Sequence, residues 1–135
     1  MTVTVDWYPA DEVEDAWDLR HCLYAYLARG GEILYIGKSW GVSVRGRWTR
    51  SAKPAFWNAL ERERHIFDHN AVVGLLELPS QRRLTEQLLA DVESLLIYAE
   101  QPWGNIQSRR SRIQRPGLTV RSRGDWPGRR AYRDE

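Results

Sequence analysis

The sequence predicts an α+β (mixed α/β) fold in which helices flank a small three-stranded sheet that starts with a β-hairpin. Three observations carry this prediction. Two short apolar runs are separated by a pair of glycines, a third apolar run over residues 71–78 is closed by Pro79, and a long helical pattern follows over residues 81–100. A hairpin, helices, a strand and a long helix in this order are typical of a small sheet covered by helices.

The hairpin is expected over residues 21–28 and 33–37, which read HCLYAYLA and ILYIG. Gly30 and Gly31 lie between the two runs and can supply the positive φ angles of a tight reversal. Because successive side chains of a strand alternate between faces, Tyr24 is expected to leave the sheet on the face opposite Leu23.

Two shorter helices are expected between the hairpin and the third strand. Residues 43–51 place Val44 and Trp48 four positions apart on one side. Residues 54–69 form the second predicted helix, whose apolar residues for burial are Phe56, Leu60 and Phe67. His65 and His69 in this helix have the spacing of two metal ligands. Few further ligands exist in the chain, so two surface histidines are the favoured interpretation.

The helix predicted over residues 81–100, with Ser80 as its N-cap, has the clearest apolar stripe. The stripe consists of Leu84, Leu88, Leu89, Val92, Leu95, Leu96 and Ala99. Glu93 lies on one rim of the stripe with Glu86 close by, and Asp91 lies on the opposite rim. A rim carboxylate can be half-buried and still face a cleft. The helical wheel alone does not choose among these three acids.

The net charge of +2 conceals a division along the chain. Residues 106–135 hold nine Arg against three acids, a net charge of +6, whereas residues 1–105 have a net charge of −4. Residues 1–18 hold six acids and no base. A basic tail is typical of proteins that bind nucleic acid, and a solvated tail is the alternative.

Several classes of protein are excluded by length and composition. A chain of 135 residues corresponds to one domain. No apolar run approaches the roughly 20 residues of a membrane span, and the acidic first residues do not resemble a signal peptide. Cys22 is the only cysteine, which excludes an internal disulfide and fits a reducing compartment. A cytoplasmic protein that does not bind membranes is therefore expected.

Two tyrosines eleven positions apart, Tyr24 and Tyr35, begin a longer pattern. The pattern comprises Cys22-Leu23-Tyr24, Tyr35-Ile36-Gly37, Lys38, Arg45, Glu93, Leu96-Ile97, Pro102 and Asn105. In this order and spacing the sequence resembles the GIY-YIG nucleases, and especially the N-terminal nuclease domain of the bacterial excinuclease that acts in DNA repair. The first motif departs from the family, because Cys22 and Leu23 replace Gly and Ile.

The resemblance covers about residues 20–106 and implies a division of the chain into three parts. These are an acidic N-terminal extension (1–19), a GIY-YIG-like nuclease domain (20–106) and an Arg-rich C-terminal extension (107–135). The tail can be an extended arm or an edge strand around residues 118–120. The resemblance also selects Glu93 from the three acids of the long helix.

By resemblance, the chain is an endonuclease that hydrolyses phosphodiester bonds with a divalent metal, leaving 5′-phosphate and 3′-hydroxyl ends. Tyr24 is expected to act as the general base, Arg45 to stabilise the phosphate, and Glu93 to bind Mg²⁺, with Mn²⁺ as an alternative. The remaining expected catalytic residues are Tyr35, which orients water or phosphate, Lys38, which with Arg45 lowers the pKa of Tyr24, and Asn105. Surface or packing roles are the alternative for each residue, and Arg47 competes with Arg45.

Nucleic acid is the expected partner, DNA rather than RNA. The arginines predicted to bind it are Arg47, Arg50, Arg109, Arg110, Arg112 and Arg115, and Trp126 and Tyr132 are candidates for stacking on unpaired bases. No second DNA-reading domain is recognisable, so targeting is expected from the tail, a homodimer or a protein partner. The competing function is a catalytically silent module that binds nucleic acid or another partner on the same scaffold.

Overall fold

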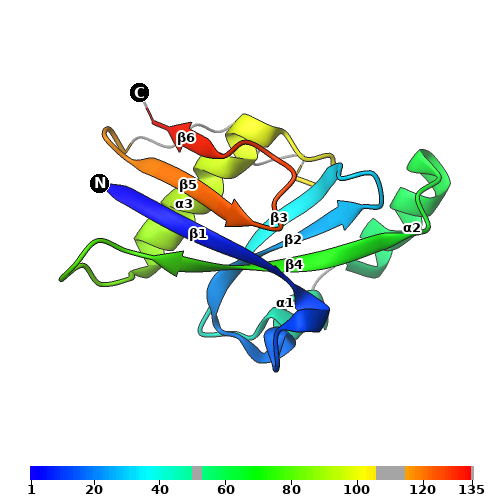
Figure 1. Cartoon of the computed structure of the whole chain (residues 1–135). Coiled ribbons are helices and arrows are strands. Elements are labelled where there is room, and N and C mark those ends of the chain that lie inside the picture. Colours follow the sequence, from blue (N-terminus) through cyan, green and yellow to red (C-terminus); the bar gives the residue numbers. More distant parts are fainter. Residues whose placement is uncertain (50–52, 106–114, 135) are drawn as a thin grey trace.

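The computed structural model describes residues 1–49, 53–105 and 115–134, without the side chains of residues 47–49 and 53–54. Its centre is a six-stranded sheet with the strand order β3-β2-β4-β1-β5-β6 (Figure 1). The strands are β1 (Thr2–Pro9), β2 (His21–Ala28), β3 (Ile33–Trp40), β4 (His69–Glu77), β5 (Thr119–Gly124) and β6 (Ala131–Arg133). The mixed α+β class is confirmed, but the prediction of three strands was wrong.

The three additional strands come from the two ends of the chain. β1 pairs antiparallel with β4 and parallel with β5, and β5 pairs antiparallel with β6. Val3, Val5 and Trp7 of β1 alternate into the core and are at most 1% exposed. The segments 1–19 and 107–135 were predicted as extensions, yet both contribute strands to the same sheet. The strand alternative for residues 118–120 holds, although β6 and not β5 forms the edge.

The hairpin lies where the sequence predicted it. β2 and β3 are antiparallel, with Leu23 opposite Lys38 and Tyr24 opposite Gly37. The register shifts between Tyr26 and Leu27, so β3 has one extra residue there. Gly31 provides the left-handed residue of the turn with φ +96°.

The helices predicted over residues 54–69 and 81–100 are shorter in the structure. The helical elements are the 3-10 turns η1 (Ala10–Glu12) and η2 (Ala16–Asp18), and the α-helices α1 (Val44–Thr49), α2 (Lys53–Arg64) and α3 (Glu86–Glu100). His65 follows α2 with φ +53°, and His69 begins β4 and stacks on Trp57 at 4.1 Å. The two histidines therefore do not share a helix. No helix in the described part of the chain is long and apolar enough to cross a membrane.

The N-cap of α3 is Thr85 and not the predicted Ser80. The Leu88 amide donates to the Thr85 hydroxyl oxygen at 3.1 Å, which satisfies one of the free amides at the helix start. The capping Thr85 stands five residues further along than Ser80, because the segment after β4 first forms a turn.

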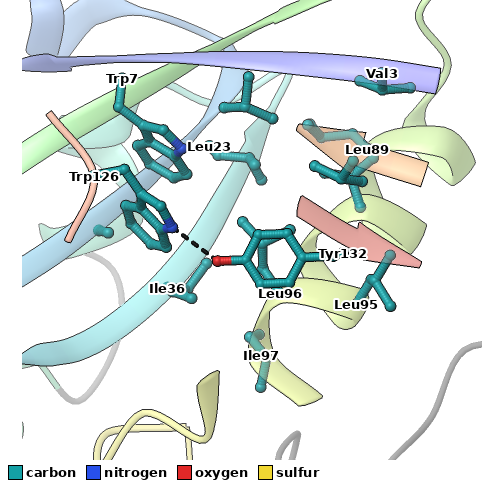
Figure 2. Close-up of a cluster of buried hydrophobic side chains, with 14 of the residues drawn as sticks. Val3, Trp7, Leu23, Ile36, Leu89, Leu95, Leu96, Ile97, Trp126 and Tyr132 are labelled. Atoms are coloured by element: carbon teal, nitrogen blue, oxygen red, sulfur yellow. Dashed lines mark hydrogen bonds between the residues drawn. The ribbon is translucent and has the colours of Figure 1, made fainter. Parts of the chain in front are cut away.

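The larger core lies between α3 and one face of the sheet, here called the α3 face (Figure 2). Trp7 and Trp126 stack there with ring centroids 4.1 Å apart. The Trp126 indole donates to the Tyr132 hydroxyl at 2.8 Å, and Tyr132 donates to Glu100 at 2.6 Å. Trp126 and Tyr132 are 2% and 3% exposed, so the prediction that they stack on bases was wrong.

The second core lies on the opposite face of the sheet, here called the tyrosine face. η1, η2, α1 and α2 cover the β2–β3–β4 part of this face, and the buried residues between them are Cys22, Tyr24, Tyr26, Leu34, Val44, Leu60 and Val73. Leu23 and Tyr24 therefore enter different cores, which confirms the predicted alternation of the first hairpin strand.

Candidate active site

The two motif tyrosines come together on the tyrosine face. Tyr35 lies opposite Tyr26 in the hairpin, and Tyr24 lies two residues from Tyr26 on the same strand. Their alternation brings the Tyr24 and Tyr35 rings to 6.2 Å between centroids, at an interplanar angle of 28°. Tyr24 is 1% exposed, whereas Tyr35 is half-buried.

Gly37 makes room for Tyr24. It is the direct cross-strand partner of Tyr24, and a Cβ at position 37 would lie 2.5 Å from both Cζ and the hydroxyl oxygen of Tyr24. No carbon can occupy that position while the ring stays in place. The glycine of the second motif therefore has a packing reason: it lets the Tyr24 phenol lie flat across β3.

An aromatic cluster surrounds the two tyrosines. Tyr26 contacts the edge of Tyr24, and Phe56 joins Tyr35 to Trp103. The pKa of Tyr26 is raised, first by burial and then by the neighbouring Tyr24 and Tyr35. Water-poor packing of this kind disfavours a phenolate, so a general base here needs nearby positive charge.

Asn105 holds the loop after α3 against β3. Its amide oxygen accepts from the Ile36 amide at 2.9 Å, and its amide nitrogen donates to the Ile36 carbonyl at 2.8 Å. Since β3 is an edge strand, Asn105 takes the place of a neighbouring strand for one residue. Its contacts are those of a positioning residue that fixes the second motif, and both ends of its side-chain amide are engaged in them.

Gly104 belongs to the same attachment, although no sequence pattern singled it out. Its amide donates to the Leu34 carbonyl at 2.7 Å, and a Cβ at this position would lie 2.6 Å from that oxygen and 2.5 Å from Phe56. The helix stop before it, with Pro102 and then Gly104 and Asn105, was the available signal. Together Gly104 and Asn105 fix the end of α3 relative to the tyrosine motif.

Arg45 lies on α1, which contacts both β3 and η2. The α1 helix is anchored by buried Val44, whose amide donates to the Leu19 carbonyl at 3.0 Å. The Arg45 side chain is 65% exposed, and its Nε lies 3.7 Å from a carboxylate oxygen of Asp18. Asp18 was not singled out in the sequence; it places one acid of the N-terminal segment beside the predicted phosphate-binding residue.

Lys38 leaves β3 on the other side of the sheet. It lies opposite Leu23, whose side chain is buried against α3, and directly paired residues share a face. Lys38 is therefore on the α3 face while Tyr24 and Tyr35 are on the tyrosine face. The predicted role of Lys38 in lowering the pKa of Tyr24 is disfavoured, since the sheet separates the two side chains.

The three acids of α3 differ in their surroundings. The Asp91 carboxylate accepts from Arg115 at 2.6 Å and from Gln87 at 2.8 Å. Glu86 is exposed in the first turn. Glu93 is half-buried, one turn after Leu89 and one turn before Ile97, both of which are buried. Asp91 and Glu93 are thus both partly buried, whereas Glu86 is exposed. Asp91 is engaged by Arg115 and Gln87.

Among the six arginines predicted to bind nucleic acid, only the side chain of Arg115 is described. Its guanidinium is paired with Asp91, and its backbone amide donates to Asp134, so it connects α3 to the tail. Arg50, Arg109, Arg110 and Arg112 lie outside the described residues, as does the side chain of Arg47.

No group of three or more His, Cys, Asp or Glu side chains forms a metal cluster within residues 1–49, 53–105 and 115–134. Comparison of the chain with protein-family models, with curated proteins and with solved structures finds no match. The case for a function therefore depends on the residues themselves.

Proposed function

We propose that this chain is a divalent-metal-dependent endonuclease of the GIY-YIG type. The observation that carries the proposal is the pair of motif tyrosines, Tyr24 and Tyr35, held 6.2 Å apart on one face with Gly37 beneath Tyr24. Arg45 and Glu93, which match the family in sequence order, lie on α1 and α3. Both helices contact β3, although the buried residues of α3 pack on the face opposite Tyr24 and Tyr35. Asn105 supports the same view, because it fixes the backbone of the second motif.

Arg45 is the proposed phosphate ligand. A guanidinium can donate two parallel hydrogen bonds to a phosphate, which lysine does not do. Its contact with Asp18 at 3.7 Å joins two largely exposed side chains, and such surface pairs are weak. A substrate phosphate can therefore displace Asp18 from Arg45. Until the phosphate binds, Asp18 keeps the Arg45 side chain near the proposed phosphate site.

Glu93 is the proposed ligand of Mg²⁺ or Mn²⁺. Mg²⁺ prefers oxygen ligands and is commonly held by one or two protein carboxylates together with water and substrate phosphate, so a single half-buried carboxylate fits it. The bound ion supplies a Lewis acid for the leaving oxygen. α3 contributes rigidity, since its neighbouring side chains Val92 and Leu96 are fully buried.

Tyr24 is the proposed general base, and its burial sets a condition on this role. A free tyrosine has a pKa near 10, so its hydroxyl gives up a proton at neutral pH only beside positive charge. Water must also reach a residue that is 1% exposed. Tyr35, which is half-buried, is the residue proposed to orient that water or the phosphate.

The test is a cleavage panel over single-stranded DNA, duplex DNA and RNA with Mg²⁺, Mn²⁺ or EDTA. We expect Glu93→Gln to lower the cleavage rate by about 10²–10³-fold, the size of effect seen when one electrostatic contact to a transition state is removed. The matched control is Glu86→Gln, which removes an exposed acid from the same helix and should cut at the parental rate. Cleavage by Glu93→Gln at the parental rate would contradict the assignment.

The second candidate is a catalytically silent nucleic-acid-binding module, and the 1% exposure of Tyr24 is the observation that favours it. This function predicts salt-dependent binding of nucleic acid with no cleavage of any substrate in the panel under either ion.

A further inference from the structure

The β1–β5–β6 part of the tyrosine face differs from the part that contains the tyrosines. Its outward residues on β5 and β6 are exposed, including Arg121, Arg123 and Arg133. The strand register shows that they share a face with Tyr24. Directly paired residues share a face: Tyr24 pairs with Val73, and Val73 pairs with Tyr8. Thr4 is four residues from Tyr8, so it shares this face, and it pairs with Arg121.

A groove of about 430 Å³ runs along this open part. The six residues that give it its character are Thr4, Thr119, Arg121, Arg123, Arg130 and Arg133. Among the residues that the structure describes, the groove lining contains four arginines and no acid. A concentration of guanidinium groups attracts a polyanion. The two acids that pair with one of them, Asp6 and Glu77 on Arg123, are not among the described lining residues.

The four arginines are not equivalent. Arg123 is held by Asp6 at 2.7 Å and by Glu77 at 2.7 Å, and Arg130 donates to the Gly124 carbonyl at 3.2 Å. Arg121 and Arg133 make no ion pair with any residue that the structure describes, and they are diagonal neighbours on β5 and β6. These two arginines are available to an external ligand, while the other two brace the groove.

We propose that this groove binds the sugar-phosphate backbone of a nucleic acid strand that continues to the tyrosine site. That the nucleic acid continues from the groove toward Tyr24 rests on the proposed nuclease function. Arg121 and Tyr24 are three strand spacings apart across the sheet and four residues apart along it, about 20 Å in all. This separation corresponds to about six base pairs of duplex at 3.4 Å each.

Charge and composition favour nucleic acid over other polyanions. Guanidinium groups form bidentate contacts with phosphate, and threonine hydroxyls commonly contact the backbone of nucleic acids. Ala131 is the only apolar side chain among the described lining residues. This part of the groove therefore has neither the aromatic centre of a protein interface nor the apolar face of a membrane-surface helix.

The experiment measures binding without cleavage. The full-length Glu93→Gln chain is titrated in EDTA with a fluorescein-labelled 20-nucleotide single strand and a 20-base-pair duplex at several salt concentrations. We expect Arg121→Gln with Arg133→Gln to weaken binding at least about tenfold and to reduce the slope of log K against log salt by about 2, one for each phosphate contact. Both arginines are exposed on the sheet surface, and equal thermal unfolding of the variant and its parent verifies the fold.

The matched control is Arg82→Gln with Arg83→Gln, two exposed arginines in the loop before α3. It changes the net charge equally and should leave the slope unchanged. Equal losses in both double variants, or none in either, would overturn the groove proposal. The proposal would also be overturned if the Arg121, Arg133 double variant bound nucleic acid like its parent but lost binding to phosphatidylserine vesicles.

The two proposals fail separately. Arginine-dependent binding without cleavage in any divalent ion supports the groove and contradicts the nuclease. Cleavage and binding at the parental level by the Arg121, Arg133 double variant support the nuclease and contradict the groove.

Discussion

The tyrosine face of the sheet has two parts that differ in cover and in chemistry. Over β2, β3 and β4 it is packed beneath helices, and Tyr24 there is 1% exposed. Over β1, β5 and β6 it is open and carries exposed arginines. A group that must be activated benefits from a dry, fixed setting, whereas a group that holds a charged chain must be reachable. One continuous sheet provides both settings, because helices cover only the β2–β3–β4 part of the tyrosine face.

The difference between the two parts depends on the tail being folded into the sheet. Trp126→Ala removes the ring that stacks on Trp7 and leaves a cavity beneath the open part, so we expect a loss of about 3–5 kcal/mol in the free energy of unfolding. Urea unfolding measures this loss. Trp126→Phe retains an aromatic ring and should lose less, and a loss below about 1 kcal/mol for Trp126→Ala would show that the tail is only loosely attached.

The covered part depends on the space left at Gly37. Gly37→Ala places a methyl group 2.5 Å from the Tyr24 ring, so either the ring or the strand must move, at a cost of about 1–3 kcal/mol in stability. Under the proposed function, cleavage falls as well because Tyr24 is displaced. Gly30→Ala is the matched control, since nothing lies within 4 Å of a Cβ there. Equal stability of the two variants would mean that Tyr24 does not occupy the space over Gly37.

The edge of the covered part depends on Asn105. Asn105→Ala leaves the Ile36 amide and carbonyl without their side-chain partners, and we expect a loss of about 2 kcal/mol. Hydrogen exchange is the sharper measurement: the Ile36 amide should exchange faster, while Leu23 in the neighbouring strand should not change. Asn58→Ala, an exposed residue of α2, is the control. Unchanged exchange at Ile36 would contradict this role.

Local patterns predicted the covered part well. The alternation of the first hairpin strand predicted opposite faces for Leu23 and Tyr24, and they enter different cores. The family resemblance implied that Tyr24 and Tyr35 act together, and their rings lie 6.2 Å apart. The same alternation also places Lys38 on the face opposite Gly37, a consequence that the family pattern obscured. The partner of Asn105 could not be predicted, because Ile36 lies 69 residues away in the chain.

The open part was missed for two reasons. In the first eight residues the alternation of Val3, Val5 and Trp7 is readable, but the acidic composition of residues 1–18 outweighed it. In the tail, β5 finds its partner in β1, so its pairing is set by contacts more than 100 residues apart that no local pattern encodes. Trp126 and Tyr132 consequently looked like surface aromatics in a basic arm.

A pH-dependent effect tests whether water is excluded from the covered part. Burial raises the pKa of the Cys22 thiol from 9.0 to about 12, so between these pH values the unfolded chain loses a proton that the folded chain keeps. The stabilisation is complete below pH 9 and falls as pH rises toward 12, by at most about 1.4 kcal/mol per pH unit. Cys22→Ala has no thiol to titrate, so its free energy of unfolding lacks this pH dependence. The difference in unfolding free energy between the parent and Cys22→Ala, measured in urea, should therefore shrink between about pH 8 and about pH 11. Tyr26 and Tyr132, whose pKa values are also raised by burial, are common to both chains and cancel in the comparison. A difference that stays constant across that range would mean that water reaches Cys22, and the contrast between a dry and an open part of this face would then fail.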